Sequence, residues 1–95
     1  MTEFEWDPAK SEANLIKHGI DFAGAARVFD GPVLEERSDR GDEERRKAVG
    51  LLAGREITVI YTLREGRCRI ISARRARRNE RRAYRALYPG DPAGE

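Results

Sequence analysis

The 95-residue chain has a single cysteine, Cys68, and a single histidine, His18. One cysteine excludes an internal disulfide framework, and its strand-like surroundings favour a buried, unreactive thiol. With so few soft ligands, we expect no metal site and no cofactor. No apolar run approaches the ~20 residues of a membrane-spanning helix, and the N-terminus MTEFEWD lacks the features of a signal peptide. We therefore expect a cytoplasmic protein with no membrane partner.

Acidic residues are scarce after residue 44. Residues 1–44 carry twelve acidic and five basic side chains (−7), and residues 45–95 carry five and fourteen (+9), which together give the net charge of +2. Sixteen of the nineteen basic residues are arginine, whose planar group binds phosphate bidentately and stacks on bases. This asymmetry indicates an anionic partner for the second half of the chain, although pairing with the acidic half offsets part of it.

The apolar pattern predicts one α+β domain over residues 1–88 and a flexible tail at residues 89–95. Asp7-Pro8 and Asp21 are typical helix starts, and Gly19 is a typical helix end. The other elements are expected as strands at residues 3–6, 33–37, 45–52, 56–63 and 68–73, and as an arginine-rich helix at about 75–88. Consecutive hairpins after two helices predict a small antiparallel sheet with the helices on one face, which leaves the other face or its rim for a ligand.

Helical spacing predicts which side chains of the three helices face the core. These are Ala9, Ala13, Ile16 and Ile20 in the first helix, Phe22, Ala25, Ala26 and Phe29 in the second, and Ala76, Ala83, Tyr84 and Leu87 in the last. The opposite, polar face of the first helix is expected to carry Lys10, Asn14, Lys17 and His18.

Two separate blocks of the sequence resemble the BrnT family of toxins from bacterial type II toxin–antitoxin pairs. They are FEWDPAK…N..KHGI.F..A..VFD near the start and RIISARRA…ER..Y near the end, and together they extend from Phe4 to Tyr84. Ser38–Arg46 and the residues after Tyr88 depart from the family pattern. The resemblance implies a RelE-like fold and a metal-free ribonuclease activity that blocks translation and arrests growth. It also implies a cognate ribbon-helix-helix antitoxin, a toxin–antitoxin heterotetramer, and binding of operator DNA through the antitoxin.

Cleavage of RNA without a metal makes defined demands on side chains. The 2′-hydroxyl attacks the neighbouring phosphate, so a base must take its proton, cations must stabilise the phosphoryl oxygens, and an acid must protonate the departing 5′-oxygen. Arginine stays protonated in proteins and cannot be the base. Proton transfer therefore falls to His18, the lysines, the tyrosines or a carboxylate such as Glu80.

The candidate catalytic residues come from the first helix and from the second half of the chain. Arg74 and Arg77 flank the predicted junction of a strand with the last helix, where a sheet rim and a helix N-terminus meet and favour phosphate. Glu80 follows as a partner that holds Arg69 or Arg74, or as a general base. Cations at the end of the first helix also suit its dipole without any catalytic role. The full catalytic set is His18, Lys10, Arg64, Arg74, Arg77 and Glu80.

The candidate RNA-binding residues form a basic patch on the sheet and the last helix. Arg69 is expected to share a strand face with Ile71 and Ala73, so its charge must be paired or face a working surface. The set is Lys17, Arg45, Lys47, Arg69, Arg78, Arg81 and Tyr84, with Tyr84 either stacked on a base or packed in the core. A second hypothesis is a non-catalytic module that binds nucleic acid or a protein partner through the same arginines.

Overall fold

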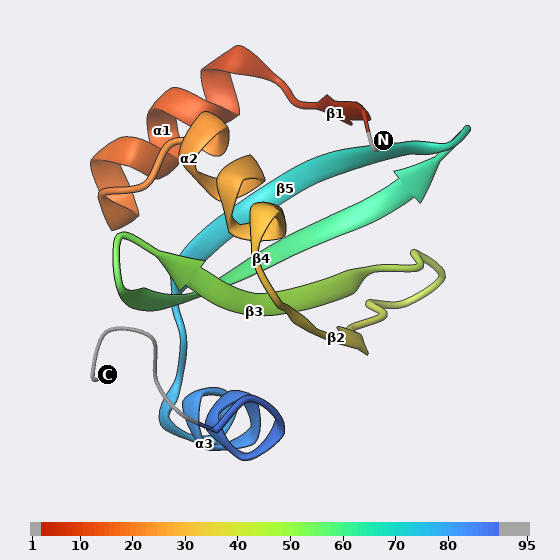
Figure 1. Ribbon diagram of the computed structural model, residues 1–95. Coiled ribbons are helices and arrows are strands. Elements are labelled where there is room, and N and C mark those ends of the chain that lie inside the picture. Colours follow the sequence, from red (N-terminus) through yellow and green to blue (C-terminus); the bar gives the residue numbers. More distant parts are fainter. Residues whose placement is uncertain (1–2, 90–95) are drawn as a thin grey trace.

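The computed structural model describes residues 3–89, which form a five-stranded mixed sheet with helices on both faces (Figure 1). The sheet order is β1-β5-β4-β3-β2. The elements in chain order are β1 (Glu3–Glu5), α1 (Pro8–His18), α2 (Phe22–Arg27), the 3₁₀-helix η1 (Val28–Asp30), β2 (Leu34–Arg37), β3 (Arg46–Leu52), β4 (Arg55–Arg64), β5 (Arg67–Arg75) and α3 (Arg78–Leu87). The α+β class is confirmed, and residues 90–95 of the expected tail lie outside the described residues.

The sequence pattern predicted an antiparallel sheet, but the sheet is mixed. Strands β2 to β5 pair antiparallel, but β1 pairs parallel with β5, with Phe4 opposite Cys68. This pairing joins segments more than sixty residues apart, so no turn signal in the sequence marks it. Phe4 holds β1 in place by packing on Phe29, with ring centroids 5.3 Å apart.

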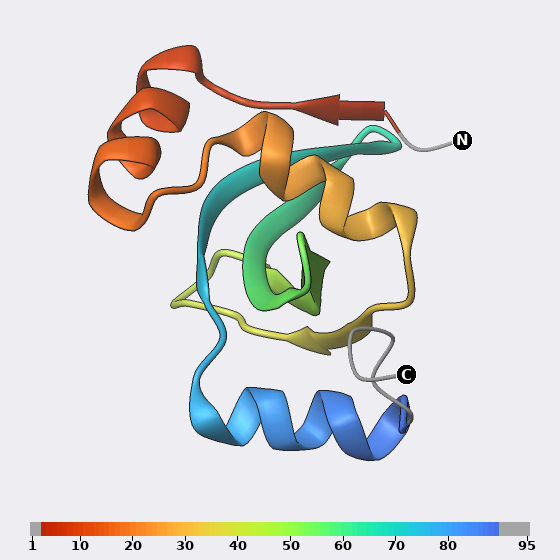
Figure 2. The same ribbon diagram turned by 60° about the vertical axis from the view of Figure 1, so that its left-hand side comes forward.

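The helices cover opposite faces of the sheet, and the expectation that they share one face is wrong (Figures 1 and 2). Helices α1 and α2 lie over β5, whereas α3 packs on β2 and β3 from the other side. The cause is that the central strands are apolar on both sides. Ile57 and Val59 of β4 face α2, while Val49 of β3 packs with Tyr84 of α3.

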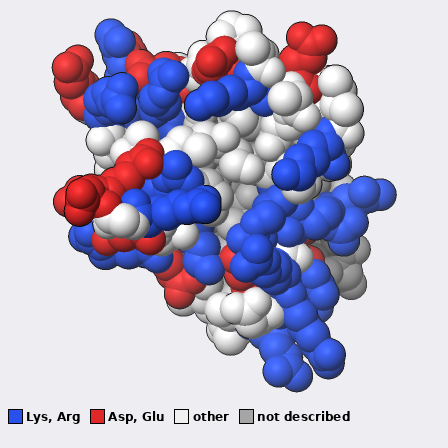
Figure 3. Space-filling model, turned by 180° about the vertical axis from the view of Figure 1, so that it is seen from behind, with Lys and Arg blue, Asp and Glu red and all other residues white. Residues whose placement is uncertain are grey.

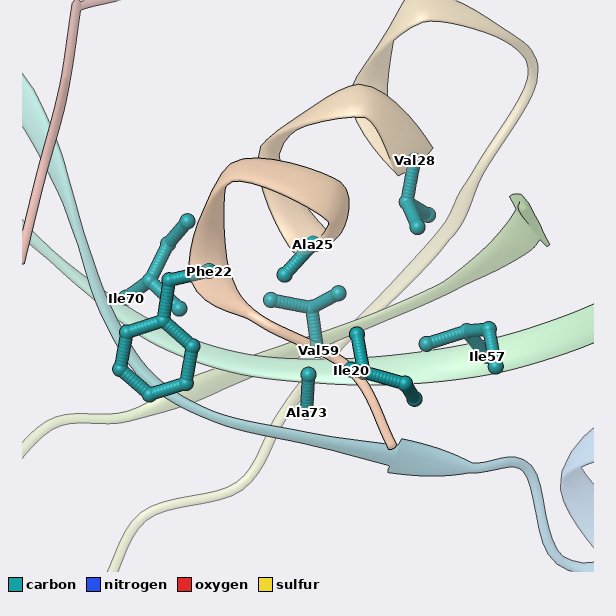
Figure 4. Close-up of a cluster of buried hydrophobic side chains, with 8 residues drawn as sticks. All are labelled: Ile20, Phe22, Ala25, Val28, Ile57, Val59, Ile70 and Ala73. Carbon is teal, nitrogen blue, oxygen red and sulfur yellow. The ribbon is translucent and has the colours of Figure 1, made fainter. Parts of the chain in front are cut away.

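The main core lies between α2 and the sheet (Figure 4). It consists of Ile20, Phe22, Ala25, Val28, Ile57, Val59, Ile70 and Ala73. The expected inward face of the second helix is thus confirmed for Phe22 and Ala25. Gly50 of β3 lies so close to this layer that an added Cβ would be 2.7 Å from Cγ1 of Val28, so only glycine fits there.

A β-bulge in β5 decides which arginines face which side. Ile60 pairs with Ser72 but Tyr61 pairs with Ile70, so Ile71 is an extra residue. The bulge puts Ala73 in the core layer with Ile70, and the expected shared face of Arg69, Ile71 and Ala73 is therefore wrong.

Helix α1 packs on the sheet through the face that was expected to be exposed. Ala9, Ala13 and Ile16 are exposed, and the buried side chain of the helix is Asn14. Its amide nitrogen donates to the carbonyls of Ile20 (2.8 Å) and Ala73 (2.9 Å), and its oxygen accepts from Ala73 N (3.4 Å). Because β1 covers only Arg67–Arg69 of β5, the later edge of β5 is open, and Asn14 satisfies its backbone.

Helix α3 also differs from its prediction, since it begins at Arg78 and not near residue 75. Ala83 and Leu87 are exposed, whereas Glu80 and Tyr84 are buried against the sheet. The buried carboxylate is accommodated by cations of the sheet, which lie beneath the helix. No helix among residues 3–89 is both long and apolar enough to cross a membrane.

Candidate nucleic-acid interface

A groove of about 280 Å³ lies on the α3 side of the sheet, between the β2–β3 loop and the β5–α3 junction. We call it the arginine groove, and its lining consists of Ser38, Asp39, Arg40, Arg45, Ile60, Arg74 and Arg77. Four of these seven side chains are arginines and one is a carboxylate. Seen from behind the view of Figure 1, Lys and Arg side chains gather on both sides of an uncharged area (Figure 3).

Each arginine of the groove is placed by a different part of the fold. Arg74 lies on β5, one residue from its end, and Arg77 is the N-cap residue of α3. Arg45 immediately precedes β3, and Arg40 lies in the preceding loop, which is closed by backbone hydrogen bonds of 3.0 Å between Arg40 and Glu43. The four cations therefore meet because the loop before β3 and the junction of β5 with α3 border the same groove.

Much of the cationic charge of the groove is not neutralised by carboxylates among residues 3–89. Among the described residues, neither Arg40 nor Arg77 forms an ion pair with a carboxylate. Arg45 pairs with Glu43 at 3.0 Å, but its Nε is a buried donor with no hydrogen-bond partner among residues 3–89. Such a donor loses its water without compensation, so an anionic acceptor in the groove would stabilise it.

Arg74 is the exception, because a buried carboxylate holds it. Oε1 and Oε2 of Glu80 accept from Nη1 and Nη2 of Arg74 at 2.7 and 3.0 Å. Glu80 also accepts from Nζ of Lys47, from Oγ1 of Thr58 and from the backbone N of Arg77, at 2.8 to 3.0 Å. Five donors thus fix one carboxylate, and through it the position of Arg74.

The pKa of Glu80 follows from these contacts. Burial alone would raise the pKa of this carboxyl group, but the hydrogen bonds from Arg74, the backbone of Arg77, Lys47 and Thr58 outweigh burial and lower it far below its usual range. Glu80 is therefore an anion at neutral pH with all its acceptor positions engaged. This geometry suits a residue that positions Arg74 and not one that takes up a proton.

The structure brings some of the predicted residues together and separates others. Arg45, Arg74 and Arg77 line the groove, and Lys47 and Glu80 adjoin it through Arg74. Arg64, at the end of β4, and Arg78, in the first turn of α3, are exposed and do not line it. Arg69 pairs with Glu5 at 3.3 Å across β1 and β5, and Arg81 donates to the carbonyl of Ala76 at 2.7 Å.

Three predicted residues of α1 lie away from the groove. Lys10, Lys17 and His18 do not line it, and His18 borders a different groove at the end of α1. Tyr84 is buried, and its hydroxyl donates to the carbonyl of Pro32 at 3.3 Å, which fits the alternative of a core aromatic.

The sequence prediction missed Arg40, Ile60 and Thr58. Arg40 sits within a run of acidic residues, which indicated only a solvated loop. The polar Thr58 in the middle of an apolar strand was a usable signal for a polar partner beneath α3. Among residues 3–89, no three His, Cys, Asp or Glu side chains come together in a way that could hold a metal ion.

Comparison with known protein families gives a match over most of the chain. Residues 6–80 match the model of a family described as the ribonuclease toxin, BrnT, of type II toxin–antitoxin systems. The matched region contains every residue of the arginine groove and both partners of the Arg74–Glu80 pair. No curated protein matches the chain.

Proposed function

Since the chain belongs to the BrnT family of type II toxin–antitoxin ribonuclease toxins, we propose that it cuts RNA bound in the arginine groove, without a metal ion. A toxin of this class implies an RNA substrate and a cognate antitoxin. The observation that carries the proposal is the convergence of Arg40, Arg45, Arg74 and Arg77 in one groove. Two of these guanidinium groups are without an ion pair in the described part of the chain, and arginine is suited to bind phosphate bidentately.

The proposed roles of the cations differ because their surroundings differ. Arg74 is held bidentately by Glu80, so it is preorganised to stabilise charge that develops on the phosphoryl oxygens during attack by the 2′-hydroxyl. Arg40 and Arg77 are exposed and are suited to bind the flanking phosphates of the strand. Ile60 also lines the groove and provides an uncharged surface, against which a sugar or base can lie.

Several finer properties belong to the same proposal. We propose that cutting blocks translation and arrests growth, and that a ribbon-helix-helix antitoxin neutralises the toxin in a heterotetramer that binds operator DNA. The resemblance of the two sequence blocks supports these properties, as it supports a RelE-like arrangement of the sheet and helices. Inducible expression with and without the adjacent gene, followed by mapping of RNA ends, tests them together.

The direct test of the site is RNA cleavage by the Arg77→Ala variant in the presence of EDTA. Arg77 is exposed, so its truncation leaves the fold intact, and we expect cleavage to fall at least about tenfold through loss of a phosphate contact. Arg82→Ala is the matched control, since Arg82 is an exposed arginine of α3 that does not line the groove. Full activity of the double variant Arg74→Ala, Arg77→Ala would show that RNA is cut at another site.

A second candidate is a module that binds RNA without cutting it. It is favoured by two observations. The lysine and histidine candidates of α1 do not line the groove, and the carboxylate of Glu80 is fully engaged by hydrogen bonds. Under this alternative, the wild-type protein binds RNA with the same dependence on Arg77 but leaves the strand intact.

A further inference from the structure

Helix α1 presents apolar side chains to solvent and keeps a fixed orientation while doing so. Ile16 is 82% exposed and Leu15 is 46% exposed, and they are two of the four large hydrophobic residues with exposed side chains among residues 3–89. Asn14, on the inner face, ties the helix to Ala73 of β5, so α1 cannot rotate to bury them without breaking these hydrogen bonds. The exposure is thus built into the fold.

A second groove lies at the C-terminal end of the same helix. Its volume is about 460 Å³, and its lining consists of His18, Gly19, Ile20, Leu52, Ala53, Arg55, Ile57 and Arg75. Leu15 lies one helical turn before His18 and Gly19, so the exposed face of α1 continues into this α1-end groove. The floor is apolar, since Ile20 and Ile57 belong to the main core and Leu52 packs against it.

The α1-end groove is lined by basic and uncharged residues only. Arg55 and Arg75 are exposed, neither is in an ion pair with a described residue, and none of the lining residues carries a carboxylate. An apolar floor bordered by unpaired arginines is complementary to a polypeptide segment that carries both apolar and acidic side chains. RNA fits less well, because the side chains of Ile20, Leu52 and Ile57 in the floor are apolar and a helix C-terminus disfavours phosphate.

The two grooves lie on opposite sides of β5. Successive side chains of a strand point to opposite faces, and so Arg74 lines the arginine groove while its neighbour Arg75 lines the α1-end groove. A ligand bound at the second groove therefore contacts the same strand end as the proposed RNA site without occupying it.

We infer that the cognate antitoxin docks on Leu15, Ile16 and the α1-end groove through an acidic segment with apolar side chains. The inference rests on the proposed function, because a toxin of this family has an antitoxin partner. It adds that the anchoring contact is separate from the arginine groove. The antitoxin then does not need to compete with RNA for Arg40 and Arg77 in order to bind.

The test uses the full-length toxin and the antitoxin purified from their co-expressed operon, with affinity measured by titration calorimetry. Ile16→Glu and Arg55→Glu are each expected to weaken antitoxin binding by about tenfold or more, as for residues central to an interface. The matched controls are Leu87→Glu, at an exposed leucine of α3, and Arg82→Glu, at an exposed arginine of α3. We expect both controls to bind the antitoxin as the wild type does.

Two further measurements separate the possible outcomes. Ile16→Glu and Arg55→Glu should cut RNA at the wild-type rate in the absence of antitoxin and unfold at the wild-type temperature.

The inference is overturned if both variants bind antitoxin normally or if the controls lose as much affinity. It is also overturned if Arg77→Ala, in the arginine groove, is the variant that loses affinity for the antitoxin. It is also overturned if Arg55→Glu weakens RNA binding instead, or if Ile16→Glu abolishes a dimer of the toxin alone. Loss of antitoxin binding by a toxin that never cuts RNA would instead refute the proposed function and keep the docking site.

Discussion

The carboxylate of Glu80 lies beneath the arginine groove and accepts two hydrogen bonds from the guanidinium group of Arg74, at 2.7 and 3.0 Å. The side chain of Glu80 is 2% exposed, whereas those of Arg74 and Lys47 are 20% and 21% exposed. The anion is thus enclosed by the cations that it holds, and the cations reach the surface. We therefore expect the carboxylate of Glu80 both to stabilise the fold and to position Arg74 for the proposed binding of RNA.

Replacement of Glu80 by alanine should destabilise the protein by about 3 kcal/mol. This is the lower end of the cost of breaking a buried ion pair, because Arg74 and Lys47 keep some contact with water. Urea unfolding followed by circular dichroism measures the change in the free energy of unfolding. The control is Glu44→Ala, at an exposed residue, which should change it by less than about 0.5 kcal/mol. A loss no larger than that of the control would mean that the network does not stabilise the fold.

Acid should weaken the fold through the same residue. The pKa of Glu80 is lower in the folded state than the ~4.3 of an unfolded glutamate, so the unfolded chain binds this proton first as the pH falls. The contribution of Glu80 is therefore complete above about pH 5 and is lost progressively below the unfolded pKa of ~4.3. Urea midpoints measured between pH 7 and pH 3 should fall more steeply for the wild type than for Glu80→Gln, which cannot ionise. Parallel slopes would refute the assignment.

Local sequence patterns correctly predicted those parts of the fold that depend on residues close together in the chain. Asp7 and Asp21 cap α1 and α2 by accepting from the backbone N of Ala9 and Gly24, and Gly19 ends α1 with φ 75°, as expected. These signals lie within one helical turn of the element that they define. The exposed stripe of α1 was misjudged because helical spacing identifies an apolar face but not what covers it.

The pairing of β1 with β5 and the bulge in β5 could not be predicted from the pattern of apolar and polar residues. The parallel register of Glu3 with Arg67 has no local signal, and the bulge at Ile71 shifts every later residue of β5 to the opposite face. The junction of Arg74 and Arg77 was predicted, because it follows from the order of strand and helix. Arg40 was not, because only the folded β2–β3 loop brings it to the groove.

Truncation of Asn14 should cost the protein about 2 kcal/mol or more. Asn14→Ala leaves the carbonyls of Ile20 and Ala73 and the amide of Ala73 without their side-chain partner, and each buried unpaired group costs roughly 1 to 3 kcal/mol when water cannot reach it. The measurement is urea unfolding together with hydrogen exchange of the Ala73 amide, which should accelerate. Lys17→Ala, on the exposed face of the same helix, is the control and should leave both quantities unchanged. An unchanged Ala73 exchange rate in Asn14→Ala would contradict the role of Asn14 at the edge of β5.

The salt dependence of RNA binding should distinguish free arginines from those paired within the chain. A guanidinium group that binds a phosphate releases a counterion from the RNA, and each such contact contributes about −0.7 to the slope of log affinity against log salt for a single strand. Arg67 is already paired with Glu3 and Glu5, at 3.3 and 3.6 Å, so it has little charge to offer to RNA. Arg40→Ala and Arg77→Ala should therefore each reduce the slope by about 0.7, whereas Arg67→Ala should leave it unchanged.

This measurement requires an RNA that binds but is not cut. A strand with 2′-O-methyl groups lacks the hydroxyl that attacks the phosphate, so its affinity can be measured by fluorescence anisotropy from low to high salt. Equal slopes for the wild type, Arg40→Ala and Arg77→Ala would show that neither residue contacts phosphate. A reduced slope in Arg67→Ala alone would place the RNA on the β1–β5 side of the sheet, because an arginine paired within the chain changes the slope only if RNA displaces its carboxylates.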